Sequence, residues 1–584
     1  MSPNQASKPV QIPLLIGVTG HRDLLYQETA PLRVAARNFL VQLQGRFPNA
    51  PLCLASSLSA GADLLVTEEA LGLGIDCIAV LPLPLDAYRE DFENPDELRH
   101  FEAVLDRCRQ RLVCPLKEGV RPEDAAIAGP ARTAQYALAG EIIAGASFIL
   151  LALWDGRGAV NAAGTAHTVE FRLARRAWLE DASDPDQQDL LPNLQPDLVY
   201  HIVASRGGGP PVPGLAPLQE GYRCGPDAPL QAHLPASAVL VAERTAELNR
   251  DLRRHAVSIS RDVSADELTA DLAAIPASVV DATHLFNAID WLAGRMRRNV
   301  MRTLYATSVL MVIMGVFFLA YSHGVECSFC HYAILGFLAA FVALLGINVL
   351  ANARHWHRRY LESRALAEGL RVELFWAVAG VATNGTPAVH RALLKQADPG
   401  LEWIPNTIRA VSLMLADLRP TGIVGGLDFA MRQWVGVNSE TGSRSQQLYY
   451  YWHASRTKAA FASFAERLAR GSVVIGFLVA IVLAVEELLE ERVLHRDLLF
   501  CIGFFSLLGG VVEALVQKTA QRELQRQYEY MYAVFLAAHE RLMGARTDGE
   551  RRSILSLLGR AALAEHAQWL LLHRDRPIDR SRMQ

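Results

Sequence analysis

Residues 14–24 read LLIGVTGHRDL, an apolar run that stops at a threonine, a glycine, a histidine, an arginine and an aspartate. The run has the length and composition of a strand buried on both faces of a sheet. Its polar end has two explanations: a tight turn that happens to be polar, or part of a cradle for an anionic ligand. The remaining sequence helps to decide between these two explanations.

About the first 250 residues alternate short apolar segments with helical patterns. Strands are predicted at 14–18, 52–55, 77–81, 148–153 and 199–204. Helices are predicted between them, at 30–45, 61–73, 97–111, 131–144 and 168–179. Because buried strands that alternate with helices form parallel sheets covered on both faces, this part is predicted to be an α/β doubly wound parallel sheet.

In sheets of this kind, ligands bind beyond the carboxyl ends of the strands. Three of the predicted strand ends carry hydroxyl groups, glycines or charged side chains, and the helix that starts at Gly61 adds a positive dipole end. Hydroxyl groups and accessible backbone amides suit a phosphate-bearing ligand. The candidate ligand residues are Thr19, Gly20, His21, Arg22, Ser56, Ser57, Gly61, Asp63, Pro82, Asp155, Gly156, Gly164, Thr165 and Glu170.

Each candidate also has a purely structural explanation. Glycine and serine form tight strand-to-helix turns, and His21 can cap a helix or pack against one. Asp63 stands in the first turn of a predicted helix, where the helix dipole favours a carboxylate in any case. Because three such strand ends converge on one sheet edge, a ligand-binding site is favoured over purely structural turns.

The charge and the hydrophobic content of the chain narrow the class of protein to which it can belong. With 57 basic and 61 acidic residues the net charge is −4, which argues against a general nucleic-acid binder. Hydrophobic residues make up 51% of the chain, a high value for a soluble protein. The excess lies in the second half, in four long apolar runs.

These runs predict four membrane spans, each of about the 20 residues needed to cross a bilayer. They are residues 303–322, 332–353, 471–489 and 498–517. The first two contain no charged residue, whereas the third ends at two glutamates and the fourth contains one. For the second pair the alternative is a helical hairpin buried in a soluble core.

Lysine and arginine predict the orientation. They gather at 295–302, 354–359, 456–470 and 518–526 and are sparse in the two short loops, 323–331 and 486–497. Since positive charge stays in the cytoplasm, both termini and the segment between the span pairs are predicted to be cytoplasmic. Cys327 and Cys330 then lie in an outer loop, where a disulfide, a metal site and unpaired thiols all remain open.

Polar groups within or beside the spans are candidates for a pore or an ion pathway. They are Asn348, Glu513, Glu486 and Glu487. A glutamate near a span end can instead reach the interface, and an acidic loop is commonly just solvated. Because four short spans enclose little space, a pore would need a homo-oligomer.

The N-terminal motifs resemble the SLOG superfamily, which includes the DNA-processing protein A fold, the cytokinin-activating phosphoribohydrolases and sensor domains of bacterial immune systems. The resemblance covers about residues 12–205 and rests on GVTGHRDL (17–24), SSLSAGADLLVTEEALGLGIDCIAVLPLP (56–84), YALAGEIIAGASFILLALWDG (136–156) and GTAHTVEF (164–171). It implies a Rossmann-like fold that binds a nucleotide or a nucleotide-derived signal, such as a cyclic nucleotide or an ADP-ribose derivative.

The enzymes of that superfamily place a glutamate three residues after a Gly-Thr pair. Here Gly164 and Thr165 are followed at that position by Thr168, and Glu170 comes two residues later. A group that acts on a bond has to lie within hydrogen-bond reach of it. The offset therefore favours a sensor, which binds its ligand without cleaving it, over a hydrolase. No bound cofactor is expected.

The second half resembles two SLATT-type modules, each with two spans followed by a long amphipathic helix. The segment GRAALAEHAQWLLLHRDRP (559–577) is the more specific part of this match. The expected domains are 1–260, a SLOG-like sensor; 261–384, a first two-span module; 385–455, a cytoplasmic connector; and 456–584, a second two-span module.

The combined resemblance implies a membrane effector in bacterial defence against phage, located in the plasma membrane and gated by a nucleotide signal. Its expected partners are that signal, the bilayer and further copies of the chain, without nucleic acid. A membrane-tethered nucleotide or N-glycoside hydrolase is the first alternative. A non-catalytic scaffold or regulatory membrane protein is the second.

Overall fold

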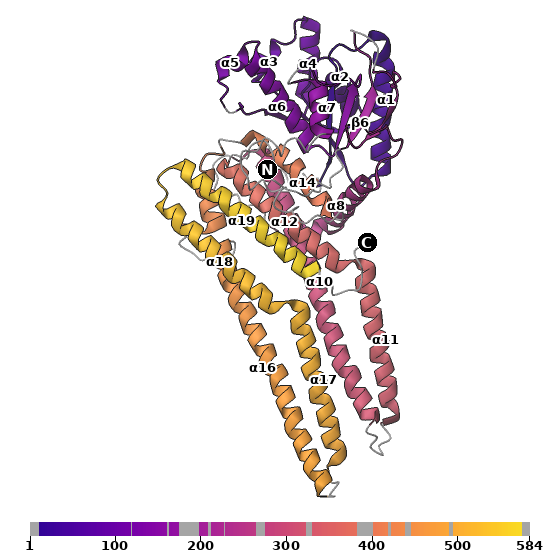
Figure 1. Ribbon diagram of the computed structural model, residues 1–584, viewed down its shortest axis with the longest axis vertical. Helices are drawn as coiled ribbons and strands as arrows, with labels where there is room; N and C mark the ends of the chain where they lie inside the picture. The colour runs from indigo at the N-terminus through magenta and orange to yellow at the C-terminus, as the bar shows by residue number, and fades with distance from the viewer. Residues whose placement is uncertain are drawn as a thin grey trace. The chain divides into compact units, whose positions relative to one another are not determined.

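A computed structural model describes twelve segments of the chain, which are residues 11–117, 119–160, 163–173, 198–207, 212–226, 228–263, 275–322, 330–381, 401–418, 422–437, 446–489 and 494–574. The chain divides into two compact units (Figure 1). The sheet unit comprises Met1–Ala288, Glu368–Ala430 and Thr547–Leu563, and the helix unit comprises Ile289–Ala367, Met431–Arg546 and Ala564–Gln584.

In the described part of the sheet unit, seven strands form one sheet in the order β4-β3-β2-β1-β5-β6-β7. The first six are parallel, and β7 runs antiparallel to β6. The five predicted strands are confirmed as β1 (Leu14–Gly20), β2 (Leu52–Ser56), β3 (Asp76–Leu81), β5 (Ile149–Trp154) and β6 (Val199–Val203). The edge strands β4 (Gln110–Val113) and β7 (Glu220–Arg223) were not predicted, and residues 110–111 belong to β4 rather than to a helix.

Strand order places the candidate residues at a special point of the sheet. β1 lies between β2 and β5, with β3 and β4 continuing on one side and β6 and β7 on the other. The chain therefore reverses its direction of travel across the sheet at the β1/β5 pair. In open parallel sheets, this switch point is where the loops diverge and ligands bind.

Helices cover both faces of the sheet. One apolar cluster joins Leu15, Ala55 and Leu150 to residues of α6 and α7, and a second joins Ala79 and Leu81 to residues of α2, α3 and α4. The helices of the N-terminal region are α1 (Tyr26–Arg46), α2 (Ala62–Gly72), α3 (Leu85–Arg89), α4 (Pro95–Arg107), α5 (Pro122–Ala126), α6 (Pro130–Ala146), α7 (Thr165–Leu173) and α8 (Ala236–Asp262).

A segment from far along the chain completes the core of this sheet. Helix α14 (Trp403–Met414) contributes Ala410 and Leu413 to the same apolar cluster as α6 and the central strands. The side-chain amide of Gln110 on β4 also donates to the carbonyl of Met414 at 2.7 Å. Part of the segment expected to be a connector thus belongs to the core of the sheet unit.

The sheet unit also contains the parts of α12 (Trp356–Ala379) and α19 (Asp548–Arg574) that fall in residues 368–379 and 548–563. The indole of Trp376 donates to the carbonyl of Leu555 at 3.0 Å, and its ring lies against Gly559. The carbonyl of Val378 accepts from Ile423, which precedes α15 (Gly426–Ala430). The two helices that follow the span pairs in sequence are therefore in contact.

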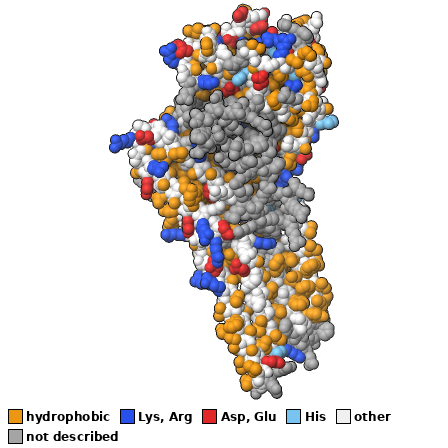
Figure 2. All heavy atoms as spheres, viewed as in Figure 1, with side chains coloured by type: hydrophobic (Ala, Val, Ile, Leu, Met, Phe, Trp, Pro, Cys, Tyr) orange, Lys and Arg blue, Asp and Glu red, His pale blue; other side chains and the backbone are white. Residues whose placement is uncertain are grey.

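Four described helices are long and apolar enough to cross a membrane. They are Ala277–Ser322, Tyr332–Arg354, Gln447–Leu488 and His495–Gly544. The first is α10 (Ala277–Ser322), the second is most of α11 (Cys330–Arg354), the third is α16 (Gln447–Leu488), and the fourth joins α17 (His495–Thr519) and α18 (Gln521–Gly544). Only 11–17% of their most apolar windows is buried within the protein, which leaves apolar side chains outward as lipid contact requires (Figure 2). A soluble hairpin buried in a core would not show this exposure.

Each predicted span lies in one of these helices, so the four spans are supported by both length and exposure. Gly315 of α10 lies against Leu507 of α17, and Gly336 of α11 lies against Phe317 of α10. Small residues let helices approach closely in membranes. Residues 323–329, with Cys327, lie outside the described segments, and Cys330 is the first residue of α11.

Candidate functional site

The loop after β1 is held by two glycines. Thr19 and Gly20 are the last residues of β1 and pair with β5. A Cβ on Gly20 would overlap the Cβ of Ala62, and a Cβ on Gly61, whose φ is +83°, would overlap the carbonyl oxygens of His21 and Arg22. These glycines therefore let the start of α2 pack directly on the loop after β1, which accounts for them without a ligand.

The loop after β2 is organised around Asp63. This carboxylate is 3% exposed and accepts hydrogen bonds from the hydroxyls of Ser57 and, at 2.9 Å, Ser59. Burial raises the pKa of Asp63 to about 6, although the serine hydrogen bonds and Arg22 favour the charged form. Its Oδ1 has no hydrogen-bond partner among the described residues. Ser56 faces inward and accepts from the amide of Leu58 at 3.1 Å.

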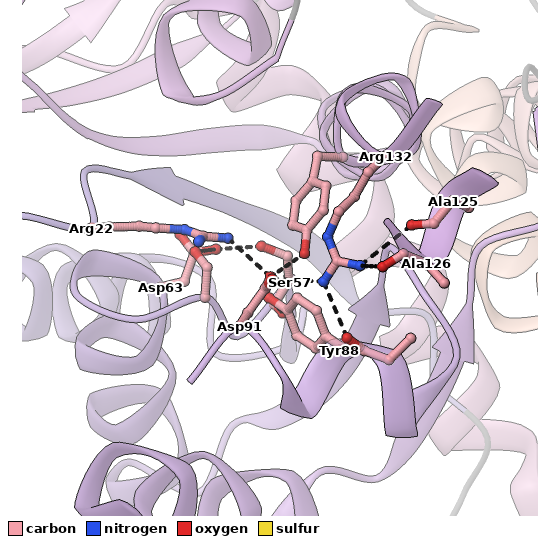
Figure 3. Close-up of polar contacts among 11 residues, drawn as sticks. Arg22, Ser57, Asp63, Tyr88, Asp91, Ala125, Ala126 and Arg132 are labelled. Carbon is pink, nitrogen blue, oxygen red and sulfur yellow. Dashed lines mark hydrogen bonds and ion pairs between the residues drawn. The ribbon is translucent and has the colours of Figure 1, made fainter. Parts of the chain in front are cut away.

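Arg22 extends from the loop after β1 toward residues of other elements (Figure 3). Its side chain is 50% exposed, lies 3.6 Å from Asp91 and stands over the ring of Tyr136 at 5.6 Å. Asp91 is fixed more tightly, since Arg132 donates to it at 2.8 Å and the Tyr136 hydroxyl also donates to it. Arg22 is thus a half-exposed guanidinium held by one long ion pair, with donors to spare.

Arg132 and Tyr88 fix the surroundings of this group (Figure 3). Arg132, on α6, donates to the carbonyls of Ala87, Ala125 and Ala126 as well as to Asp91. The Tyr88 hydroxyl donates to the carbonyl of Ser57 at 3.0 Å. These contacts join α3, α5 and α6 to the loop after β2, so the neighbours of Arg22 are held in place.

The end of β5 carries a buried pair of titratable groups. His21 and Asp155 are 8% and 1% exposed, and the His21 Nε2 lies 3.2 Å from an oxygen of Asp155. Burial lowers the pKa of His21, against the attraction of Asp155. Nearby, His201 on β6 is fully buried, bonds the carbonyl of Trp154 at 2.8 Å, and has its pKa lowered by burial to about 4.

The loops after β1 and β6 meet at this end of the sheet. Leu24 and Arg206 form an antiparallel bridge, and Arg206 pairs with Asp23 at 3.2 Å. A Cβ on Gly156, whose φ is +86°, would approach Leu215 at 2.6 Å. His21, Asp155 and Gly156 are therefore packed against the protein itself, and the accessible part of the switch point is the Arg22 side.

The remaining sequence candidates lie around α7 and β3. Thr165 is the first residue of α7, and the Gly164 carbonyl accepts from the Thr168 hydroxyl at 3.1 Å. A carboxylate oxygen of Glu170 accepts from the backbone amide of Ala159 at 2.6 Å, so this side chain fixes the preceding loop. Pro82 is buried directly after β3.

The candidate ligand residues thus fall into two groups. Arg22, Ser57 and Asp63 come together with Asp91 and Tyr136, whereas His21 and Asp155 form a separate buried pair. Sequence reasoning missed Asp91, Arg132 and Tyr136 because none stands directly after a predicted strand. Asp91 comes ten residues after the third predicted strand, too far along the chain for the rule on strand ends to find it.

The polar contacts of each pore candidate that are described below lie within its own helix or hairpin. Asn348 donates to the Leu344 carbonyl of its own helix, and Glu513 accepts from Gln517 one turn along α17. Glu486 accepts from the amide of Leu494 at 2.8 Å, and Glu487 lies 3.6 Å from His495. About 27 Å of α17 separates Glu513 from the helix start at His495.

No known protein family, curated protein or solved structure matches the chain. Within the described residues, no three His, Cys, Asp or Glu side chains are grouped as metal ligands.

Proposed function

We propose that this protein is a membrane effector controlled by a nucleotide-derived signal. The signal binds at the carboxyl edge of the sheet beside Arg22, and its binding changes the state of the four spans. The observation that carries the proposal is the half-exposed Arg22 at the β1 end of the switch point, in a chain with four membrane-spanning helices.

The chemistry around Arg22 suits a phosphate-bearing ligand. A guanidinium presents several donors in a planar fork that matches phosphate oxygens. Ser57 and Ser59 in the neighbouring loop are only partly buried, and their hydroxyls could donate to a ligand by turning away from Asp63, to which they now donate. The 3.6 Å pair with Asp91 is long, so Arg22 gives up little when it turns to a ligand.

Within the sheet unit, a chain of contacts joins the sheet to parts of the two helices that follow the span pairs in sequence. α14 packs on the sheet, the segment after it bonds Val378 of α12, and Trp376 of α12 contacts α19. α12 follows the first span pair in sequence and α19 follows the second. A ligand can shift such a system only by the difference in its affinity for the two states.

The resemblance to SLOG and SLATT modules supports the biological part of the proposal, which is a role in bacterial defence at the plasma membrane. Distribution of lysine and arginine supports cytoplasmic termini. A pore built from these spans needs several copies of the chain, so the proposed active form is a homo-oligomer. A non-catalytic scaffold is the competing function and requires no ligand.

The test uses the full-length protein in lipid nanodiscs, because α14 is part of the sheet core. Its thermal stability is measured against nucleotides, cyclic nucleotides and ADP-ribose derivatives, and each stabilising compound is then recovered and weighed by mass spectrometry. Arg22→Ala is expected to lose the stabilisation. Arg37→Ala is the matched control, since its side chain is 48% exposed and lies on α1.

The outcomes separate the candidate functions. A compound recovered intact, with stabilisation lost only in Arg22→Ala, supports the sensor and leads to ion-flux assays in liposomes. A compound recovered cleaved supports the hydrolase instead. Equal stabilisation of wild type and Arg22→Ala removes Arg22 from the site, and no stabilisation by any compound supports the scaffold.

A further inference from the structure

In each span pair, the second span is separated from the helix after it by a single residue. His355 alone separates α11 from α12, and Ala520 alone separates α17 from α18. Helices α11 and α17 both have 25 residues, and α12 and α18 both have 24. The break therefore lies at the same place in two copies of one arrangement.

Both separating residues have the same unusual backbone conformation. The φ angle is +48° at His355 and +48° at Ala520, which lies in the left-handed region. In each case the residue's amide donates to the carbonyl three residues earlier, and its carbonyl accepts from the amide four residues later. Many helices end in a left-handed residue, but that residue is usually glycine, because a Cβ is crowded there. Both breaks are therefore strained.

The local sequence around each break favours a continuous helix instead. Residues 347–368 and 511–543 contain neither glycine nor proline, the two residues that most often interrupt a helix. Alanine has the highest helix propensity, so Ala520 occupies a conformation that is far from the one it prefers. Since local preference and observed structure disagree at both places, packing elsewhere in the chain imposes the breaks.

Contacts in the first turn after each break hold the following helix out of line. At the start of α18, the Nε of Arg522 donates to Glu466 of α16 at 2.6 Å. At the start of α12, the Nε2 of His357 donates to the carbonyl of His573 in α19 at 3.1 Å. Figure 1 shows α18 leaving the direction of α17. These contacts favour the broken form, whereas the strain at the break opposes it.

Both breaks lie where a span ends. The apolar run 332–353 ends two residues before His355, and the run 498–517 ends three residues before Ala520. A change of backbone conformation at either residue therefore changes the direction of a span relative to the helix that follows it. Strained residues held by opposing contacts are typical of elements that have two states.

We propose that His355 and Ala520 are matched hinges. Each switches between the left-handed break and a helical conformation, in which the span and the helix after it form one continuous rod. The first-turn contacts stabilise the broken form, and release of backbone strain stabilises the continuous one. Because the same hinge occurs in both span pairs, the two pairs have the same means of changing direction. This proposal does not depend on the nucleotide site.

The first measurement compares glycine with alanine at three positions, by thermal unfolding of the full-length protein in lipid nanodiscs. His355→Gly is compared with His355→Ala, and Ala520→Gly with wild type. Ala533→Gly, at an exposed position inside α18, is the matched control. We expect glycine to raise the Tm by about 2 °C or more at both hinges, because it adopts the left-handed conformation without strain, and to lower it at residue 533. A lower Tm for glycine than for alanine at either hinge overturns the proposal.

The second measurement tests whether the hinge at Ala520 moves. Pulsed electron spin resonance measures the distance between spin labels at residues 514 and 537, which are exposed positions of α17 and α18. The labels are attached to non-canonical amino acids, so the native cysteines are kept. A continuous helix separates the two labelled positions by about 35 Å, and a break brings them closer together.

We expect wild type to show both distances. Ala520→Gly should reduce the population at the longer distance about fivefold or more, because it removes the strain of the broken form. Arg522→Gln should increase that population about twofold, because it removes the exposed ion pair with Glu466. A single distance in wild type means a fixed break or a fixed rod and overturns the proposal, as does a population that either variant leaves unchanged.

Discussion

Replacing Asp63 by asparagine should change how the stability of the sheet unit depends on pH. The pKa of Asp63 is raised by burial from an ordinary 3.8 to about 6. A carboxyl group with a higher pKa in the folded than in the unfolded protein binds its proton more tightly when folded. Its contribution to stability is therefore complete below pH 3.8 and is lost as the pH rises toward 6.

The magnitude follows from the two pKa values. At 1.36 kcal/mol for each tenfold difference in proton affinity, ionised Asp63 costs the folded state about 3 kcal/mol at neutral pH. His201 has the opposite sign, because its pKa is lowered from 6.5 to about 4, and it removes stability as the pH falls through that window. The wild-type profile is thus a sum of opposing slopes, and only the comparison with Asp63→Asn isolates the carboxyl group.

The assay is scanning calorimetry of the full-length protein in micelles at pH 4, 5, 6 and 7, following the transition of the sheet unit. Asparagine keeps an acceptor for Ser57 and Ser59 and does not titrate, so any fixed cost of its amide is the same at every pH. Because part of this cost is already present at pH 4, we expect Asp63→Asn to gain about 2 kcal/mol relative to wild type between pH 4 and pH 7, several degrees in Tm. Parallel profiles for the two proteins would refute the reasoning.

Two further substitutions test packing. Asn249→Ala removes three hydrogen bonds, from the amide of Ile12 and to the carbonyls of Ile12 and Asn49, at a fully buried position, and should cost about 3 kcal/mol. Faster hydrogen exchange in peptides that contain β1 would show the loss, and unchanged exchange would contradict it. Gly559→Val puts a side chain where the indole of Trp376 lies and should cost about 1–3 kcal/mol. If the new side chain displaces the Trp376 indole, tryptophan emission should shift toward longer wavelength. An unchanged emission spectrum and Tm would count against the contact between Gly559 and Trp376.

The central strands could be predicted from sequence because each is a continuous apolar run. β4 and β7 could not, since QRLV and EGYR are short, carry mixed polar residues and lie at the edges of the sheet. α14 has a clear helical pattern, but nothing in that pattern predicts that its apolar residues pack on a sheet whose strands lie about 180 to 390 residues earlier in the chain. Local patterns predict elements and leave such distant packing open.

In the candidate site, too, the sequence predicted some of the residues, and only the folded structure identifies the others. Arg22 and Asp63 follow predicted strands, so the rule for strand ends found them. Asp91 lies between two helices and Tyr136 on the helix before β5, and only the folded chain brings them to Arg22. The structure also gives Gly20 and Gly61 a packing role, which their sequence alone did not separate from a ligand role.

The packing of α14 on the sheet affects how the protein is made. During synthesis the ribosome must finish both helices of the first span pair, and the membrane must accept them, before residues 403–414 emerge. At about 5–20 residues per second, the N-terminal strands wait some tens of seconds for this helix. Until then the apolar cluster around Leu15 and Leu150 lacks Ala410 and Leu413, the part of its cover that α14 supplies. A nascent or truncated chain ending near residue 260 is therefore a natural client for chaperones, and its expression as an isolated fragment should yield aggregates.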